Sequence, residues 1–341
     1  MNKLTGLLVV MVVGGFYLAT VVLRPPGGED VIDQQERPLP PPSSTHSLAD
    51  VLRSKWDSEA YADWPVAEVM ARVSHLAYQP PLNAKADFEK LGFQRVETFV
   101  DGSMIGYVAS HDDVSVVGFH GTDDKSDWIA NLDQRTVDTP YGPVHRGFHS
   151  AYNKLRPQIV GVLKNEEPNH VWVTGHSLGG ALALVCAYDL IESGAASIDG
   201  LITFGQPMAV RDSMANHIDR ILLGKYAHYV NAFDIVPRIP PTFDHCGSLV
   251  WFKSDGSVKR SRPKRASFGA NLGAVGDSEE LTAMSLEEFR ALQEGMQPKN
   301  EPVDSANGPL VAGSSPFIRD HAMERYIDRV RSLSAEKMSP H

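Results

Sequence analysis

The chain has 341 residues, of which 42% are apolar and 22% are charged, a composition typical of globular proteins. Its length suits one large α/β domain or two smaller domains. The formal net charge is −10 at pH 7, and the isoelectric point is about 5.7. A general nucleic-acid binder needs a basic surface, so this charge argues against nucleic acid as a partner.

An apolar run from Leu4 to Leu23 opens the sequence. As a helix it would reach about 30 Å, the thickness of the hydrocarbon core of a bilayer. Lys3 precedes the run, and this slight positive bias favours an N-terminus inside the cytoplasm and the remainder outside it. We therefore predict a membrane anchor at residues 1–24. The protein would then be single-pass, with its following domain on the periplasmic or extracellular side.

A cleaved signal peptide is the second interpretation of this segment, and it would make the protein secreted. The run is long for a signal peptide, and no clean Ala-x-Ala cleavage site follows it. Residues 25–46 form a predicted linker, because closely spaced prolines give stiff extended stretches without a core-forming pattern. These prolines are Pro25, Pro26, Pro38, Pro40, Pro41 and Pro42. The globular domain is expected to occupy residues 47–335.

Residues 114–122 predict a strand that ends in a loop. Valines and alternating small residues over 114–118 are typical of a buried strand. Gly121 follows the strand, and a glycine lets neighbouring backbone come close. The loop after this strand is therefore a candidate contributor of backbone groups to a site.

A strand-to-helix junction surrounds Ser177, where residues 171–180 read V-W-V-T-G-H-S-L-G-G. The first three residues are strand formers, and residues 181–191 are apolar nearly all round, as in a helix buried on a sheet. G-x-S-x-G between a strand and a helix is the nucleophile elbow of α/β-hydrolases. We therefore predict an α/β-hydrolase fold, with a mostly parallel central sheet and helices on both faces. Ser177 is its predicted nucleophile.

A serine hydroxyl needs a base to take its proton and an acid to orient that base. In this fold the three follow along the chain in the order serine, acid, histidine. Asp234 is the best candidate acid, because it lies in the exit loop of a predicted strand at 226–232. Pro237 ends any further strand pairing. The rival acids are Asp199, Asp212, Asp219 and Asp244.

His321 is the predicted base. It lies at the start of the last predicted helix, near the C-terminus, where the last member of such a triad belongs. Asp320 is expected to cap that helix. The other histidines downstream of Ser177 are His217, His228, His245 and His341, and His245 is the main rival. His176 is expected to be a supporting hydrogen-bond partner and not a base.

Two backbone N–H groups are expected to form an oxyanion hole. One belongs to Leu178, directly after the nucleophile, and the other is assigned to Thr122 in the loop after the earlier strand. No metal is predicted: His145 and His149 are four residues apart, but no third ligand is evident. No organic cofactor is required. Cys186 and Cys246 are expected to be free thiols.

At these motifs the chain resembles the class 3 lipases, the fungal-type triacylglycerol lipases with their bacterial and eukaryotic relatives. The resemblance covers roughly Pro65 to Val330. It implies the triad Ser177, Asp234 and His321, with Thr122 and Leu178 as oxyanion donors. The residues that carry it, in the order of the family, are 119–122, 127–132, 144–148, 175–180, 234–237 and 320–323.

The resemblance also implies a short helical lid over the active site, at residues 126–132. Trp128, Ile129 and Leu132 would form its apolar face, which can rest on an apolar pocket when closed and meet lipid when open. An ordinary amphipathic surface helix is the competing interpretation. The neighbouring aspartates make the segment acidic for a strong interfacial lid.

Two later regions are less informative. Residues 250–258 predict a hairpin about Asp255 and Gly256. Residues 259–265 carry five positive charges, which suit contact with anionic lipid headgroups, but a solvated loop is the preferred interpretation. Residues 266–315 have a weak pattern, apart from a possible helix at 281–294, and we interpret them as an insertion that shapes the acyl-binding cleft.

The sequence therefore predicts a membrane-anchored serine ester hydrolase that acts on lipid or other ester substrates, most simply an acylglycerol lipase. A second possibility is a different acyl chemistry on the same triad: a phospholipase A1, a feruloyl-type esterase or a thioesterase. A third is a non-catalytic scaffold that has kept the hydrolase fold.

Overall fold

The computed structural model describes residues 46–54, 64–122, 124–261, 281–296 and 319–338. The predicted anchor at 1–24 and all but the last residue of the predicted linker at 25–46 lie outside these ranges. Within the ranges, no helix combines the length and the hydrophobicity needed to cross a membrane. The chain divides into residues 1–40 and 41–341, and every described residue belongs to the second part.

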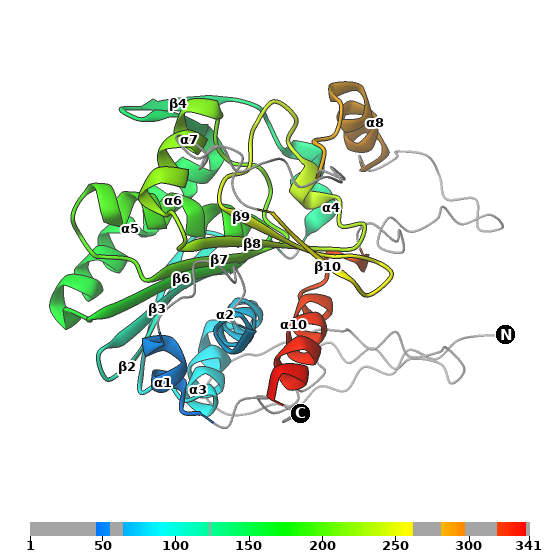
Figure 1. Ribbon diagram of the computed structural model, residues 1–341. Helices are drawn as coiled ribbons and strands as arrows, with labels where there is room; N and C mark the ends of the chain where they lie inside the picture. Colours follow the sequence, from blue (N-terminus) through cyan, green and yellow to red (C-terminus); the bar gives the residue numbers. More distant parts are fainter. Residues whose placement is uncertain (1–45, 55–63, 123, 262–280, 297–318, 339–341) are drawn as a thin grey trace, which may run out of the picture. The chain divides into compact units, whose positions relative to one another are not determined.

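Eight strands form one sheet in the order β1-β2-β3-β6-β7-β8-β9-β10 (Figure 1). The five strands from β3 to β9 are parallel neighbours, and the pairs at both edges are antiparallel. This confirms the predicted α/β architecture with a mostly parallel centre. The strands are β1 (Arg95–Asp101), β2 (Met104–His111), β3 (Val114–Phe119), β6 (His170–His176), β7 (Gly200–Phe204), β8 (Tyr226–Asn231), β9 (Ser248–Phe252) and β10 (Val258–Ser261).

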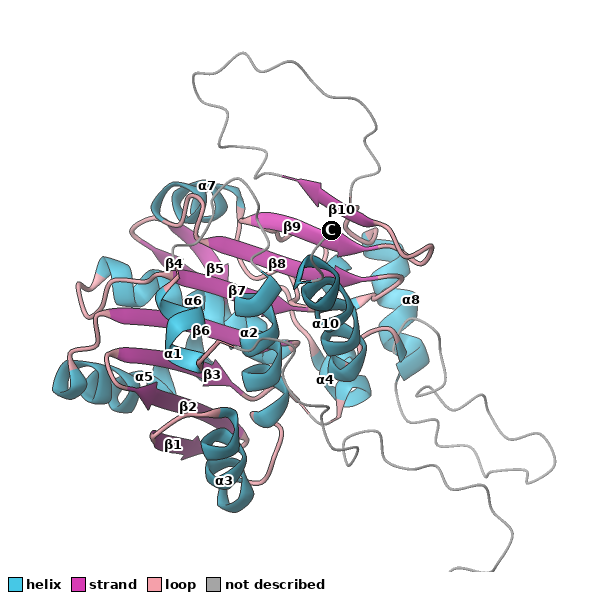
Figure 2. Ribbon diagram, turned by 60° about the horizontal axis from the view of Figure 1, so that its bottom comes forward, coloured by secondary structure: helices cyan, strands magenta, loops and turns pink. Residues whose placement is uncertain are grey.

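Helices cover both faces of the sheet (Figures 1 and 2). One face carries α5 (Arg146–Glu166) and α6 (Leu178–Glu192). The opposite face carries α1 (Leu48–Arg53), α2 (Trp64–Leu76), α3 (Pro81–Leu91) and α10 (Met323–Met338). The remaining elements are α4 (Lys125–Asn131), β4 (Thr136–Thr139), β5 (Gly142–His145), α7 (Asp212–Ile221), the short 3-10 helix η2 (Val236–Arg238) and α8 (Leu286–Met296).

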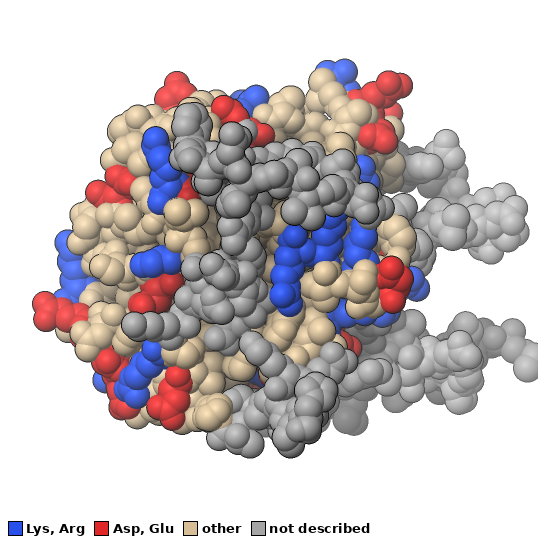
Figure 3. All heavy atoms as spheres, in the orientation of Figure 1, with Lys and Arg blue, Asp and Glu red and all other residues tan. Residues whose placement is uncertain are grey.

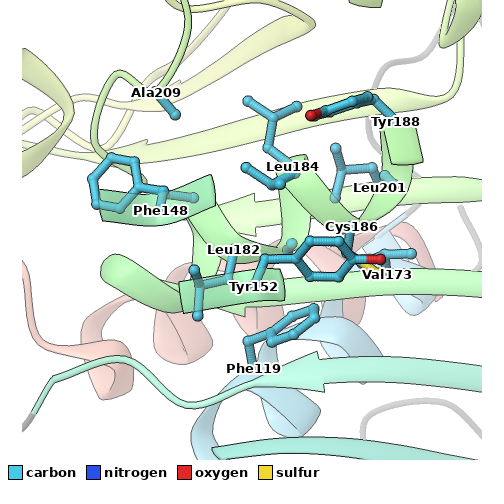
Figure 4. Packing of buried hydrophobic residues seen from close by; sticks show 14 of the residues in the cluster. Phe119, Phe148, Tyr152, Val173, Leu182, Leu184, Cys186, Tyr188, Leu201 and Ala209 are labelled. Carbon is cyan, nitrogen blue, oxygen red and sulfur yellow. The ribbon is translucent and has the colours of Figure 1, made fainter. Parts of the chain in front are cut away.

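The apolar runs of β6 and α6 place this strand and helix at the centre of the core. Strands β3, β7 and β8 are buried along their whole length, as continuous β-branched and aromatic segments between two helical layers should be. Figure 4 shows Leu182, on α6, beside Tyr152, whereas Leu184 of the same helix lies near Tyr188. Burial of each such side chain contributes about 1.5–3 kcal/mol. The sheet that carries the candidate site is therefore held rigidly.

Several local predictions are confirmed. Strands β9 and β10 form the expected hairpin, with Asp255 and Gly256 in the connecting turn. Cys186 and Cys246 are both free and buried. The predicted helix at 281–294 is present, shifted to α8, because Ser285 begins it by accepting the backbone N–H of Glu288.

The structure shows how charged side chains are arranged on one face of the protein. On the face drawn in Figure 3, acidic and basic side chains are interspersed, and several basic side chains lie side by side near the grey atoms. Of the basic run at 259–265, residues 259–261 lie in β10 and the others are outside the described ranges. Arg260 stacks over the ring of Trp64 at 5.1 Å, so part of the run packs on the protein itself.

Candidate active site

Ser177 lies between the end of β6 and the start of α6. Its backbone has φ 58° and ψ −131°, a conformation that side-chain-bearing residues rarely adopt and that is worth about 1–3 kcal/mol of strain. The Ser177 N–H donates to the carbonyl of Phe204 at 2.9 Å, which holds the turn against β7. The side chain is fully buried, and its Oγ has no hydrogen-bond partner in the described part of the chain. The turn therefore presents a serine hydroxyl that makes no hydrogen bond to the described part of the chain.

The glycines around Ser177 are required by close backbone contacts. A Cβ at Gly175 would lie 2.2 Å from the carbonyl oxygen of Gly179. A Cβ at Gly179 would lie 2.4 Å from the carbonyl oxygen of Phe119, the last residue of β3. The strand-turn-helix geometry predicted from G-x-S-x-G is therefore present. Its backbone lies in close contact with the end of β3.

Asp234 lies in the turn that follows β8. Its Oδ1 accepts the backbone N–H of Val236 at 2.9 Å, and its Oδ2 lies 2.8 Å from Nδ1 of His321. Both side chains are buried. Since a carboxylate only accepts, Nδ1 of His321 carries the proton in this bond, which leaves Nε2 as the basic nitrogen. The acid and the base predicted from sequence are thus hydrogen-bonded.

Tyr326 on α10 is a third partner at this acid, and sequence reasoning missed it. Its hydroxyl donates to Oδ2 of Asp234 at 2.5 Å and accepts the backbone N–H of Asn231 at 3.1 Å. Burial and the nearby Asp234 carboxylate raise the pKa of Tyr326 well above its usual value, so the hydroxyl stays protonated. Tyr326 therefore fixes the carboxylate that orients His321.

The segment that carries His321 differs from the prediction. Helix α10 begins at Met323, so His321 lies in the preceding turn and Asp320 does not cap the helix. The carboxylate of Asp320 instead accepts the backbone N–H of Phe233 at 3.2 Å, and its carbonyl accepts from Nδ2 of Asn231 at 2.9 Å. These two bonds tie the turn of the base to the turn of the acid.

His321 also lies beside the elbow. The ring of His176, the residue before Ser177, is 4.5 Å from the ring of His321, and Nε2 of His176 donates to the carbonyl of His321 at 2.7 Å. A Cβ at Gly205 would lie 2.8 Å from the His321 ring. Residues from β6, the turn after β8 and the turn before α10 therefore meet at one end of the parallel strands.

The rival histidines and acids have structural roles elsewhere. Nε2 of His245 bonds to the carbonyl of Pro237 at 2.6 Å, and its ring stacks on His228 at 4.5 Å. Burial lowers the pKa of His245 to about 4. Asp199 accepts the backbone N–H of Val171 at 2.9 Å, and Asp219 accepts that of Gly247 at 2.7 Å.

His217, Asp212 and Asp244 likewise lie in structural positions. Nε2 of His217 bonds to Glu192 at 2.7 Å. Asp212 is the first residue of α7, and the N–H of Asp244 donates to the carbonyl of Val210 at 2.8 Å. His341 lies outside the described residues.

The loop after β3, which carries the predicted oxyanion donor Thr122, lies against the residue before Ser177. A Cβ at Gly121 would lie 2.0 Å from the hydroxyl oxygen of Tyr78 and 2.9 Å from the carbonyl oxygen of His176. Thr122 follows and is half-buried, with Oγ1 3.4 Å from the carbonyl of Asp124. Leu178 is in the first turn of α6, where backbone N–H groups have no carbonyl four residues earlier in the helix. Leu178 directly follows Ser177, and Gly121, the residue before Thr122, lies against the backbone of His176.

Residues 116–244 match the family model described as "Lipase (class 3)". The match includes Thr122, Ser177 and Asp234 and ends before His321. A lipase of Rhizomucor miehei is 36% identical over 148 residues, which cover 39% of this chain and 40% of that protein. Residues 116–244 are therefore similar to the class 3 lipases.

Other proteins similar to this segment carry different names. A secreted mono- and diacylglycerol lipase of Malassezia restricta is 36% identical over 112 residues, covering 31% of this chain and 37% of that protein. A chloroplastic phospholipase A(1) of Arabidopsis thaliana is 30% identical over 176 residues, covering 40% and 38%. The chain thus spans about two fifths of the length of these relatives.

A solved structure extends the likeness to the fold. It is described as "A serine protease triad forms the catalytic centre of a triacylglycerol lipase", and it aligns with a TM-score of 0.52 at 27% identity. The alignment covers 58% of this chain and 85% of that one. This supports the α/β-hydrolase fold beyond the matched segment.

The predicted lid at residues 126–132 corresponds to α4. Its apolar face is turned inward: Ile129 and Leu132 are buried, and Trp128 stacks on Phe148 at 6.4 Å between ring centroids. Nε2 of Gln293, on α8, donates to the carbonyls of Ile129, Ala130 and Leu132 at 3.0–3.3 Å. Helix α8 therefore holds the C-terminal end of α4 through carbonyls that a helix leaves without intrahelical partners.

The pair His145 and His149 is not arranged as a metal site. Nδ1 of His145 accepts the N–H of Gly147 at 3.1 Å and caps α5, while its Nε2 bonds to the carbonyl of Asp133 at 2.8 Å. His149 lies beside Asn153. No group of three or more potential protein ligands for a metal occurs within the described ranges.

Proposed function

We propose that this protein is a class 3 lipase-type serine hydrolase that cleaves the carboxylic esters of lipids. The single observation that carries the proposal is the bond between Asp234 and His321, placed beside the strained turn that presents Ser177. A buried serine, histidine and aspartate in this relation are what acyl transfer requires. Relatives named as acylglycerol lipases favour a lipid ester as substrate.

In the proposed mechanism, Ser177 Oγ attacks the ester carbonyl and His321 Nε2 takes its proton. Asp234 holds the imidazole through Nδ1–H and stabilises its charged form, while Tyr326 holds the carboxylate. The N–H groups of Leu178 and Thr122 stabilise the oxyanion. His321 then returns the proton to the leaving alcohol. Water hydrolyses the acyl-enzyme by the same route, so the balance needs no metal or organic cofactor.

The choice of lipid is the finer part of the proposal. One relative is named a phospholipase A(1) and another a mono- and diacylglycerol lipase, and both kinds of substrate would present a carboxylic ester to the triad. We propose acylglycerols, with phospholipase A1 activity as the second candidate. Feruloyl-esterase and thioesterase activities and a non-catalytic scaffold are outcomes of the test.

A panel of purified substrates tests this choice. It contains tributyrin, trioctanoin, monoolein, phosphatidylcholine vesicles, a feruloyl ester and an acyl thioester, each followed by release of free acid or thiol. We expect the acylglycerols to be hydrolysed fastest. Preferential release of fatty acid from phosphatidylcholine would replace the main proposal with the second one. No hydrolysis, together with no labelling by a fluorophosphonate probe, would favour the scaffold.

The location of the protein is also a proposal. The predicted anchor lies outside the described residues, and among those residues no helix could span a membrane. Relatives named as secreted lipases support secretion over the single-pass anchor. We propose that the domain works outside the cytoplasm, and the size of the mature N-terminal peptide by mass spectrometry tests whether residues 1–24 are removed.

We also propose that α4 acts as a lid and that Gln293 holds it closed. Gln293→Ala removes the donor to three carbonyls of α4 and its following residue. Because each such bond is worth about 1 kcal/mol, we expect hydrolysis of p-nitrophenyl butyrate below its solubility limit to rise roughly 2- to 10-fold. Glu294→Ala on the exposed side of the same helix is the matched control. Equal hydrolysis rates for Gln293→Ala and Glu294→Ala would contradict the proposal that Gln293 holds α4 closed.

A further inference from the structure

Three segments of the proposed active site meet at the imidazole of His176. This side chain is 1% exposed. Its Nε2 is 2.7 Å from the carbonyl oxygen of His321, and its Nδ1 is 2.8 Å from the hydroxyl of Tyr78. A carbonyl can only accept, so Nε2 carries the proton and Nδ1 accepts from the tyrosine. These partners select one neutral tautomer of His176.

Tyr78 connects the same imidazole to the loop after β3. Its ring lies 4.9 Å from the ring of His120, and its hydroxyl fills the space that a Cβ at Gly121 would occupy, at 2.0 Å. Gly121 precedes Thr122, the proposed oxyanion donor. The hydroxyl of Tyr78 therefore packs on the oxyanion loop and hydrogen-bonds to the residue before the nucleophile.

The backbone of the base is not part of a helix or strand, so its position depends on hydrogen bonds such as those of Asp320 and the one from His176. His321 lies in the turn before α10, and Asp234 fixes only its Nδ1. A ring held at one nitrogen can still swing if the backbone that carries it moves. A displacement of about 1 Å at a catalytic group can lower the rate about 100-fold. The bond from His176 holds the one backbone carbonyl that belongs to the base itself.

We propose that His176 is a positioning residue for the reaction, which locks the backbone of His321 while Tyr78 locks His176 and packs on the oxyanion loop. In the proposed mechanism His176 neither accepts nor donates the transferred proton, and it acts through its bond to the backbone of His321. Together, His176 and Tyr78 fix the positions of the nucleophile, the base and the oxyanion loop relative to one another. This inference deepens the proposed function and rests on it.

A pair of substitutions separates the two nitrogens of His176. In His176→Gln the amide nitrogen reaches the place of Nε2 and can still donate to the carbonyl of His321. In His176→Asn the shorter amide reaches only the place of Nδ1, so that carbonyl loses its donor. We expect His176→Asn to lower kcat on p-nitrophenyl butyrate about 10- to 100-fold with KM unchanged. We expect His176→Gln to recover most of that loss.

A second readout does not depend on turnover. The Nδ1 proton of His321 in its bond to Asp234 should give a low-field proton NMR signal. We expect this signal in the unmodified protein and in His176→Gln, and we expect it to be broadened or lost in His176→Asn. His217→Asn is the matched control, because His217 is also bonded through Nε2 but to Glu192, away from the proposed site.

The outcomes separate the inference from the proposed function. If His176→Asn keeps its melting temperature, its kcat and the low-field signal, the positioning role is wrong. If His176→Asn does not fold, Tyr78→Phe replaces it, because this variant removes the hydrogen bond to Nδ1 of His176. Tyr152→Phe, which removes a hydrogen bond to Asp189, is its control, and kcat and the low-field signal are compared as before. If the unmodified protein hydrolyses no ester, the proposed function fails, and the NMR comparison still decides whether His176 positions His321.

Discussion

Ser177→Ala is expected to lower ester hydrolysis by about 10⁵- to 10⁶-fold without changing the fold. The loss is large because no other hydroxyl is presented by the strained turn between β6 and α6. The Ser177 side chain makes no hydrogen bond to the described part of the chain, so its removal leaves no structural partner unsatisfied. We therefore expect the melting temperature to stay within a few degrees, measured beside the rate on tributyrin.

A fluorophosphonate probe is the control for this prediction. It should label the unmodified protein at Ser177, identified by peptide mass spectrometry, and should not label Ser177→Ala. Ser213→Ala, on α7 and away from the proposed site, should label as the unmodified protein does. Labelling at another serine, or a variant that keeps its rate, would show that the elbow does not carry the nucleophile.

His321→Ala is expected to lower kcat by a similar factor, about 10⁵-fold, because the nucleophile and its base act as one unit. His321 is the histidine bonded to Asp234, at 2.8 Å. Its replacement leaves the buried carboxylate with the hydroxyl of Tyr326 and the N–H of Val236, so we also expect some loss of stability. Hydrolysis rates and thermal unfolding, measured on the same preparation, separate these effects.

His245→Asn is the comparison for that variant, since His245 was the main rival from sequence. It is buried with a pKa lowered to about 4, and its Nε2 faces the carbonyl of Pro237. We expect the substitution to destabilise the fold while kcat of the folded fraction stays within a few-fold. A larger fall in kcat for His245→Asn than for His321→Ala would reverse the assignment of the base.

The two partners of the proposed triad differ in how well they could be predicted. Asp234 could be recognised from its neighbours in sequence, because it follows a strongly β-forming segment and precedes Pro237. His321 has a weaker one, and the expected cap at Asp320 was wrong because that carboxylate binds the turn of the acid. A local rule for helix ends does not include a bond to residues that are far away in sequence.

Tyr326 and Tyr78 had no signal that sequence reasoning could use. Tyr326 is separated from Asp234 by 92 positions and Tyr78 from His176 by 98. Each tyrosine lies on or just after a helix that packs on the same face of the sheet, α10 or α2. Their hydroxyls meet the site only when those helices are docked, and a tyrosine in an amphipathic helix is equally compatible with an ordinary core position.

The sequence by itself determined the strand-turn-helix around Ser177, the parallel α/β architecture and the order of the candidate residues along the chain. These features depend on side-chain periodicity and on glycines that the local backbone requires, which are properties of neighbouring residues. Only the tertiary structure decided which histidine meets Asp234, where the proposed lid α4 is held and which tyrosines support the candidate site. Such contacts depend on how helices pack on the sheet, and the free energy of that packing is shared by residues from many distant segments.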